Sequence, residues 1–173
     1  MRKVDAFNHI FPIAFWEKMI EIAGETEDMG KRVRSVPMLM DMDERFRVMD
    51  MFDDYEQILS LASPPLEVMF DKDTAPELAR IANDGMAEIC QKYPDRFPGY
   101  VASLPMNNPD EAVAETERVM DGTGALGIQI FTNVAGRALD NPEYFQIFQK
   151  ASDLNIPIWM HPARGSDMAD YKD

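Results

Sequence analysis

Residues 124–131 read GALGIQIF, residues 142–153 read PEYFQIFQKASD, and residues 156–162 read IPIWMHP. The apolar runs at 125–131 and 156–160 predict two strands, because short continuous apolar runs are typical of buried strands. The segment between them is amphipathic at helical spacing and begins with proline, which is favoured in the first turn of a helix. Since a parallel strand pair needs a long connection that is usually a helix, this unit predicts a parallel sheet.

The same alternation continues toward the N-terminus. Apolar residues at helical spacing predict helices over 73–92 and 109–120. Further apolar runs predict strands at 3–8, 56–62 and 99–104. These runs are nearly continuous rather than alternating, as expected when both faces of a parallel sheet are covered. The pattern therefore predicts an α/β fold, and it suits a barrel and a doubly wound sheet equally.

A longer segment interrupts the alternation between the first two expected strands. Residues 15–52 hold two helical patterns, at 14–23 and 43–52, which are separated by the polar run GETEDMGKR. This length exceeds a simple crossover and predicts an inserted helical segment, typical of a lid or a substrate-facing loop. No internal repeat or linker is visible, so a single domain over 1–173 is the simplest organisation.

Composition narrows the classes of function. The chain carries 17 Lys and Arg against 31 Asp and Glu, a net charge of −14 that repels nucleic acids and anionic membrane surfaces. No apolar run approaches the ~18 residues of a membrane span, and no secretory signal precedes the first strand. The single cysteine, Cys90, fits a small buried side chain in a reducing compartment. We expect a cytoplasmic protein that binds neither nucleic acid nor membrane.

The chain has two histidines, and each follows an expected strand: His9 comes after 3–8, and His161 comes after 156–160. Taken alone, each suits a hydrogen-bonded structural histidine as well as a ligand. Taken together they indicate a site, because α/β barrels hold the active site at the carboxyl ends of strands, and strands one and five face each other. Neutral imidazole binds Zn²⁺ or Mn²⁺, so we expect both rings to hold a divalent metal near the barrel axis.

Five blocks in the same order resemble the amidohydrolase-related family, in particular the branch that includes aminocarboxymuconate-semialdehyde decarboxylase and γ-resorcylate decarboxylase. The opening VDAFNHIFP at 4–12 is similar to the D-x-H-x-H-x-x-P start of that family. The other blocks are RFRVMD at 45–50, QILSLASP at 57–64, ND at 83–84 with YPDRF at 93–97, and GALGIQI at 124–130 through LD at 139–140 to IPIWMHP at 156–162. The resemblance implies a metal-dependent (β/α)8 TIM barrel, present here as its first five strand-helix units.

The resemblance also implies roles for single residues. His9 matches the second histidine of the family's first-strand pair, and His161 matches the metal ligand on the fifth strand. Phe7 takes the place of the first histidine and cannot bind a metal. Asn8 lies between them and would point away from the axis on an alternating strand. The resemblance therefore implies a Zn or Mn site that is weakened or absent.

The family's remaining metal and acid-base residues, on the sixth and eighth strands, have no counterpart before the last residue, Asp173. A complete barrel takes about 250 residues, so roughly 80 more, including the catalytic residues, are expected beyond it. We therefore predict a fragment with open sheet edges. The resemblance also suggests a possible homodimer.

Several further side chains are candidates for the site. Arg45 and Arg47 are candidates for binding a substrate carboxylate, with a solvated, salt-bridged helix surface as the alternative. Arg164, in the expected loop after the fifth strand, is a candidate for the same role or for supporting a ligand. Trp159 fits packing or stacking on a substrate. Asp5, on the first strand, fits a carboxylate that orients a neighbouring group.

The resemblance implies a metal-dependent carboxy-lyase that decarboxylates a small aromatic or unsaturated carboxylic acid. The first alternative is a metal-dependent hydrolase of an ester, lactone or amide, because one barrel serves both chemistries. The second alternative is an inactive truncated fragment. Release of CO₂ distinguishes the lyase from the hydrolase.

Overall fold

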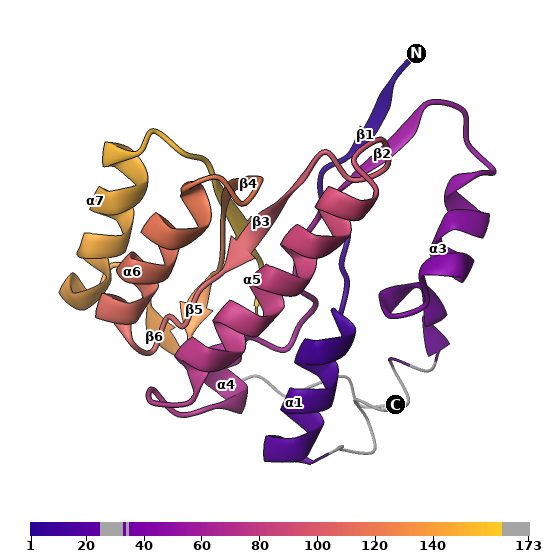
Figure 1. The fold of residues 1–173 in the computed structure, drawn as a ribbon. Helices are drawn as coiled ribbons and strands as arrows, with labels where there is room; N and C mark the ends of the chain where they lie inside the picture. The colour runs from indigo at the N-terminus through magenta and orange to yellow at the C-terminus, as the bar shows by residue number, and fades with distance from the viewer. Residues whose placement is uncertain (25–32, 34, 164–173) are drawn as a thin grey trace.

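The computed structural model describes residues 1–24, 33 and 35–163 and contains a parallel sheet (Figure 1). Its five strands, in the order β1-β2-β3-β4-β7, are β1 Lys3–Asp5, β2 Tyr55–Leu59, β3 Gly99–Ser103, β4 Ala125–Phe131 and β7 Ile158–His161. Each described strand pairs in parallel with the next. The prediction of an α/β fold with five parallel strands is therefore confirmed.

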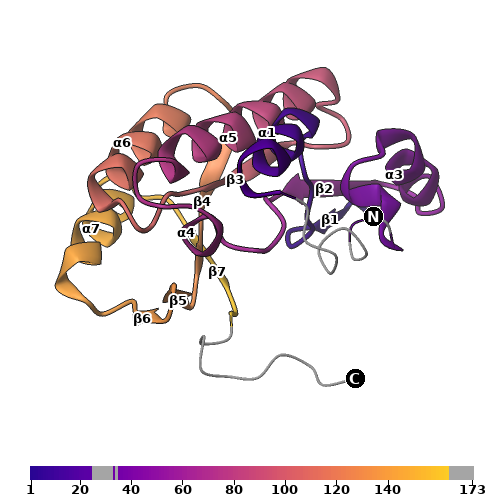
Figure 2. The same cartoon turned by 90° about the horizontal axis from the view of Figure 1, so that it is seen from below.

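Four helices follow the strands and cover the sheet on one side, as Figure 2 shows. They are α1 Ile13–Ala23, α5 Ala75–Lys92, α6 Pro109–Met120 and α7 Phe145–Asp153. Their apolar stripes pack on the strands, and Leu78, Ala82 and Met86 of α5 are fully buried. Cys90, on the same helix, is also buried, and its burial raises the pKa of the thiol to about 12. The prediction that Cys90 is a buried side chain is confirmed.

The segment predicted as an insertion, residues 15–52, contains most of α1 and two further helices where the structure describes it. It holds the 3-10 helix η1 Pro37–Leu39 and the helix α3 Met42–Met49. Asp41 begins α3, because its carboxylate accepts a hydrogen bond from the backbone N–H of Glu44. Residues 25–32 and 34 of the predicted insertion lie outside the described residues.

Several short elements were not predicted. A four-residue helix, α4 Leu66–Met69, follows β2, and a hairpin of β5 Asn133–Val134 and β6 Arg137–Ala138 follows β4. The expected helix over 142–153 begins as the 3-10 helix η2 Pro142–Tyr144 before it becomes α7. Elements of two to four residues are too short to show a helical or strand period of apolar residues in the sequence.

The predicted first strand was too long. β1 ends at Asp5, whereas the apolar run predicted a strand to residue 8. The side-chain amide of Asn8 donates to the carbonyl oxygen of Ile58 on β2 (2.6 Å) and so occupies an acceptor that a backbone N–H takes in a regular ladder. Pairing resumes at Ile10, which forms a parallel bridge with Leu61.

Among the described residues, no helix is long and apolar enough to cross a membrane.

Candidate metal centre

The two histidines lie side by side at the carboxyl end of the sheet. His161 is the last residue of β7, and His9 follows β1 by four residues. Their ring centroids are 5.1 Å apart, although β7 and β1, the strand that precedes His9, are the two edge strands of the five-stranded sheet. The strands therefore curve enough to bring both edges together, as the barrel topology predicts.

His161 is oriented by its own turn and by β4. Its Nδ1 lies 2.9 Å from the carbonyl oxygen of Pro162. A carbonyl only accepts, so Nδ1 carries a hydrogen and Nε2 of the neutral ring keeps its lone pair. The backbone N–H of Thr132 donates to the His161 carbonyl oxygen (3.0 Å), and the Phe131 ring lies 4.5 Å from the imidazole, centroid to centroid.

His9 is more enclosed. Its Nδ1 lies 2.9 Å from the hydroxyl oxygen of Ser60, which follows β2. Burial, followed by the nearby His161 and Arg45, lowers the pKa of His9 to about 4, against the opposite effect of Asp5. His9 is therefore neutral at pH 7, which is the form that binds a metal.

Aromatic rings fill the space where the family resemblance places a third imidazole. The Phe7 ring centroid is 5.2 Å from that of His9 and 5.2 Å from that of His161. Its carbon ring offers no lone pair to a metal. Within residues 1–24, 33 and 35–163, no group of three or more His, Cys, Asp or Glu side chains is placed to hold a metal ion. The described site thus consists of two imidazoles beside Phe7 and Phe131.

Asp5 bonds with its neighbours. Its carboxylate accepts from the backbone N–H of Phe7 (3.1 Å) and from the hydroxyl of Tyr55 (3.0 Å). Asp5 therefore fixes the backbone just before His9 and anchors it to β2. The groups that the Asp5 carboxylate contacts are thus the Phe7 backbone and the Tyr55 hydroxyl.

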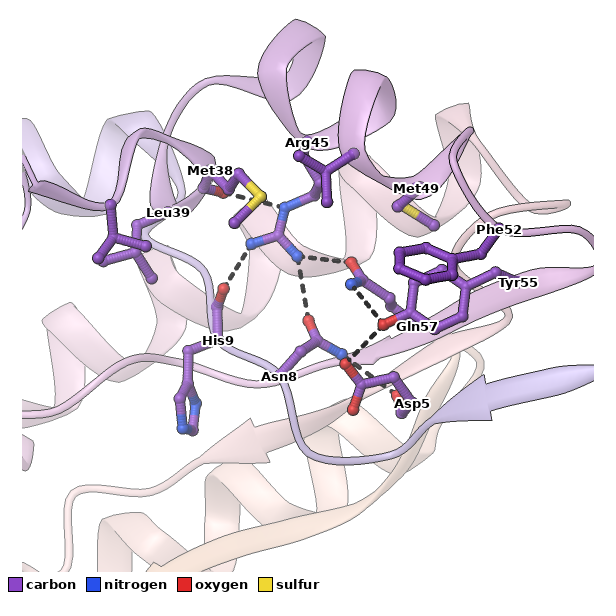
Figure 3. A pocket seen from close by; sticks show the side chains of 12 residues that line it. Asp5, Asn8, His9, Met38, Leu39, Arg45, Met49, Phe52, Tyr55 and Gln57 are labelled. Atoms are coloured by element: carbon purple, nitrogen blue, oxygen red, sulfur yellow. Dashed lines mark hydrogen bonds between the residues drawn. The ribbon is translucent and has the colours of Figure 1, made fainter.

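Arg45 of α3 reaches the segment that carries His9 (Figure 3). Its Nη1 donates to the side-chain oxygens of Asn8 (3.1 Å) and Gln57 (2.8 Å), its Nε donates to the Met38 carbonyl oxygen (3.0 Å), and its Nη2 donates to the His9 carbonyl oxygen. The imidazole of His9 points away from the guanidinium (Figure 3). Arg45 therefore holds the backbone of His9 and does not contact its ring.

The burial of Arg45 explains why it behaves as a structural group. The residue is 3% exposed, and desolvation lowers its pKa to about 10. It lines a cavity of about 350 Å³ with Asp5, Tyr55 and Gln57. Four of the five N–H groups of a guanidinium are already used on protein oxygens. The predicted contact of Arg45 with a substrate carboxylate stays a prediction.

The structure separates the other candidates. Arg47 is exposed and forms a two-pronged ion pair with Glu44 on the surface of α3, which is the alternative that the sequence left open. Arg164 lies outside the described residues. Trp159 donates from Nε1 to the carbonyl oxygen of Ala6 (2.7 Å) and so ties β7 to the segment after β1.

Sequence reasoning missed Ser60 and Phe131, both of which contact the histidines. Ser60 is a polar residue directly after an apolar strand, and Phe131 is the last residue of another strand. Because the carboxyl ends of parallel strands form the active-site edge, Phe131, at the end of the strand predicted over 125–131, could have been identified by position. Ser60 could not, because the strand predicted over 56–62 continues past it, whereas β2 ends at Leu59.

The sequence from residue 4 to residue 172 matches the family described as amidohydrolase. The chain belongs to the amidohydrolase family. This confirms the resemblance inferred from the five blocks. It also explains why two histidines from distant strands meet at the same edge of the sheet, since such barrels hold their sites there.

The relatives of this chain include decarboxylases. It is 34% identical over 126 residues to a γ-resorcylate decarboxylase from Rhizobium sp. (strain MTP-10005). This match covers 69% of this chain and 38% of that protein. It is 33% identical over 122 residues to the 2-amino-3-carboxymuconate-6-semialdehyde decarboxylase of Dictyostelium discoideum, covering 70% of this chain and 34% of that protein.

The solved structures that superpose on this chain also include decarboxylases. A 2,6-dihydroxybenzoate decarboxylase complexed with 2,6-dihydroxybenzoate superposes with a TM-score of 0.76 at 31% identity, covering 96% of this chain and 52% of the other. A dihydroxybenzoic acid decarboxylase from Polaromonas sp. JS666, with bound manganese and 2-nitroresorcinol, gives a TM-score of 0.77 at 29% identity, with 96% and 51% covered. The chain thus spans about half the length of these solved structures and less of the curated relatives.

Proposed function

We propose that a protein containing this chain is a metal-dependent decarboxylase of a small aromatic or unsaturated carboxylic acid. The observation that carries the proposal is the meeting of His9 and His161, with ring centroids 5.1 Å apart, at the carboxyl edge of the sheet. The similarity to decarboxylases of aromatic acids, one of them with bound manganese, supports the choice of reaction and of a divalent metal.

The donor set fits part of a metal site. His9 and His161 would hold the metal through imidazole nitrogens, which suit Zn²⁺ and Mn²⁺. Protein sites of this kind usually supply three or more ligands, and Phe7 occupies the position next to both rings. A bound divalent metal would polarise substrate oxygens and so stabilise the negative charge that develops when the carboxylate leaves.

The residues around the histidines suit a flat, apolar substrate. Phe7 and Phe131 each place an aromatic ring beside His161, at centroid distances of 5.2 and 4.5 Å. An aromatic ring packs favourably on such walls, which also keep water from the reacting carbon. In decarboxylation the bond to the carboxylate breaks, CO₂ leaves, and the electron pair that remains on carbon takes up a proton. The described residues bind and shield the substrate in this proposal.

Metal binding tests the site first. We expect His9→Ala and His161→Ala each to weaken Mn²⁺ and Zn²⁺ binding at least about tenfold, measured by isothermal titration calorimetry at pH 7.5, because each removes one of two ligands. Phe7→His should do the opposite and tighten binding by a similar factor, since it adds an imidazole beside both rings.

Phe145→His is the matched control for the added histidine. Phe145 begins α7 and is 56% exposed, so a histidine there should leave the affinity of the site unchanged. If Phe7→His and Phe145→His bind metal equally, the rings of His9 and His161 do not form the site.

The reaction is tested by CO₂ release from dihydroxybenzoic acids and dienoic acids in the presence of Mn²⁺. Release of CO₂ that depends on His9 and His161 would support the lyase. Hydrolysis of esters or lactones without CO₂ would establish the hydrolase instead. A protein that binds Mn²⁺ but converts neither kind of substrate would refute the proposed activity.

A further inference from the structure

Ser60 is placed by its backbone. It follows β2 directly and is 1% exposed. Its carbonyl oxygen accepts a hydrogen bond from the backbone N–H of Ile10 (2.9 Å), and the N–H of Ala62 donates to the Ile10 carbonyl oxygen (3.1 Å). These bonds hold Ser60 against the segment that carries His9 without using the serine hydroxyl.

The hydroxyl of Ser60 has two neighbours. The O–H group donates to the carbonyl oxygen of Asn8, and its oxygen lies 2.9 Å from Nδ1 of His9. A hydroxyl carries one hydrogen, and a carbonyl oxygen can only accept. The single hydrogen of Ser60 is therefore directed at Asn8, and the serine oxygen faces the imidazole with a lone pair. The hydrogen between Ser60 and His9 must then belong to Nδ1.

We propose that Ser60 is a positioning residue that holds His9 in the tautomer with hydrogen on Nδ1, so that Nε2 keeps the lone pair. Pro162 imposes the same tautomer on His161, because its carbonyl oxygen accepts from Nδ1 of that ring. In both imidazoles the free lone pair is therefore on Nε2. The purpose of this arrangement, metal binding, rests on the proposed function.

The opposite tautomer of His9 is less stable for a definite reason. With hydrogen on Nε2, Nδ1 would need a hydrogen from Ser60, and the Asn8 carbonyl oxygen would lose its donor. Asn8 is partly buried, and a buried carbonyl without a partner costs about 1–3 kcal/mol. The Ser60 hydroxyl therefore acts as a selector between the two forms of the ring.

Nitrogen NMR of the histidine side chains tests the tautomer without any metal. Two-bond ¹H–¹⁵N spectra distinguish the two tautomers. Because the chain has two histidines, the variant His161→Gln gives histidine signals from His9 only. At pH 8 we expect metal-free wild-type His9 to show hydrogen on Nδ1. Ser60→Ala should populate the Nε2–H form, and Ser60→Thr, which restores a hydroxyl, should return the wild-type pattern.

Ser103→Ala is the matched control, because Ser103 is also a buried serine at the end of a strand and is 5% exposed. Its backbone bonds to Asn83, and within the described residues its hydroxyl makes no hydrogen bond to either histidine. It should leave the His9 tautomer unchanged. In calorimetry, Ser60→Ala should weaken Mn²⁺ binding about tenfold, while Ser60→Thr and Ser103→Ala keep most of the wild-type affinity.

The outcomes separate this inference from the proposed function. Hydrogen on Nε2 in the wild type, or a Ser60→Ala spectrum identical to the wild type, would overturn the role of Ser60 whatever the protein catalyses. A wild type that shows the Nδ1–H tautomer but binds no Mn²⁺ would instead remove the metal-dependent function and leave the tautomer assignment in place.

Discussion

Glu67 offers the sharpest test of the described packing. It lies on α4, the short helix that comes after β2 and Ser60, and is 7% exposed. Its Oε1 has no hydrogen-bond partner among the described residues. Burial raises the pKa of Glu67 from 4.5 to about 7. Between these two pKa values, Glu67 keeps its proton in the folded protein but loses it in the unfolded chain. The free energy of unfolding therefore falls as the pH rises from about 4.5 to 7.

The size of the effect follows from the two pKa values. Each unit of pH in that window changes the free energy of unfolding by about 1.4 kcal/mol. The sequence pI is about 4.5, where low net charge favours precipitation, so the measurement is better made from pH 5.5 to 8. Over that range the wild type should lose about 2 kcal/mol relative to Glu67→Gln, whose amide does not titrate.

Urea unfolding at several pH values measures the difference, provided that the transition is two-state. Glu77→Gln, at an exposed position of α5, is the matched control and should run parallel to the wild type throughout. If the curves of the wild type and Glu67→Gln also run parallel, Glu67 is ionised in the folded protein and its burial has been misread.

Two further substitutions test the support of the site. Arg45→Met should reduce the free energy of unfolding by about 3 kcal/mol or more in urea, because several buried oxygens lose their donor, whereas Arg47→Met should leave the midpoint unchanged. Equal effects would show that Arg45 is not buried as described. Gly127→Ala should cost about 1–3 kcal/mol, since a Cβ there would clash with the Pro157 carbonyl oxygen, and an unchanged melting temperature would contradict that contact.

The arrangement of the sheet could be predicted because it depends on alternation along the chain. A regular alternation of strands and helices is typical of parallel strands, which need such crossovers, and short crossovers place each strand next to its predecessor. The end of β1 could not be predicted, because the apolar run continues beyond Asp5 while the side chain of Asn8 takes a ladder acceptor on Ile58. The hairpin of β5 and β6 was missed because its strands have two residues each.

The meeting of His9 and His161 was predictable from topology, since both follow parallel strands that face each other in a barrel. The role of Arg45 was not. Its neighbours Asp43 and Glu44 suggest a solvated helix surface, and only tertiary packing reveals that Arg45 turns inward while Arg47 pairs with Glu44 outside.

Each imidazole is oriented by its neighbouring strand, and this determines what should limit metal binding. Ser60, after β2, holds His9, and β4 holds His161 through the backbone of Thr132 and the ring of Phe131. These supports lie within the described chain, so in the proposed site the two rings would be positioned before a metal binds. The affinity for a metal should then depend on how many ligands the site has, because little ordering of the two rings is needed on binding. A third imidazole in place of Phe7 would add a ligand to a pair that is already ordered, which is why a single substitution is expected to have a large effect.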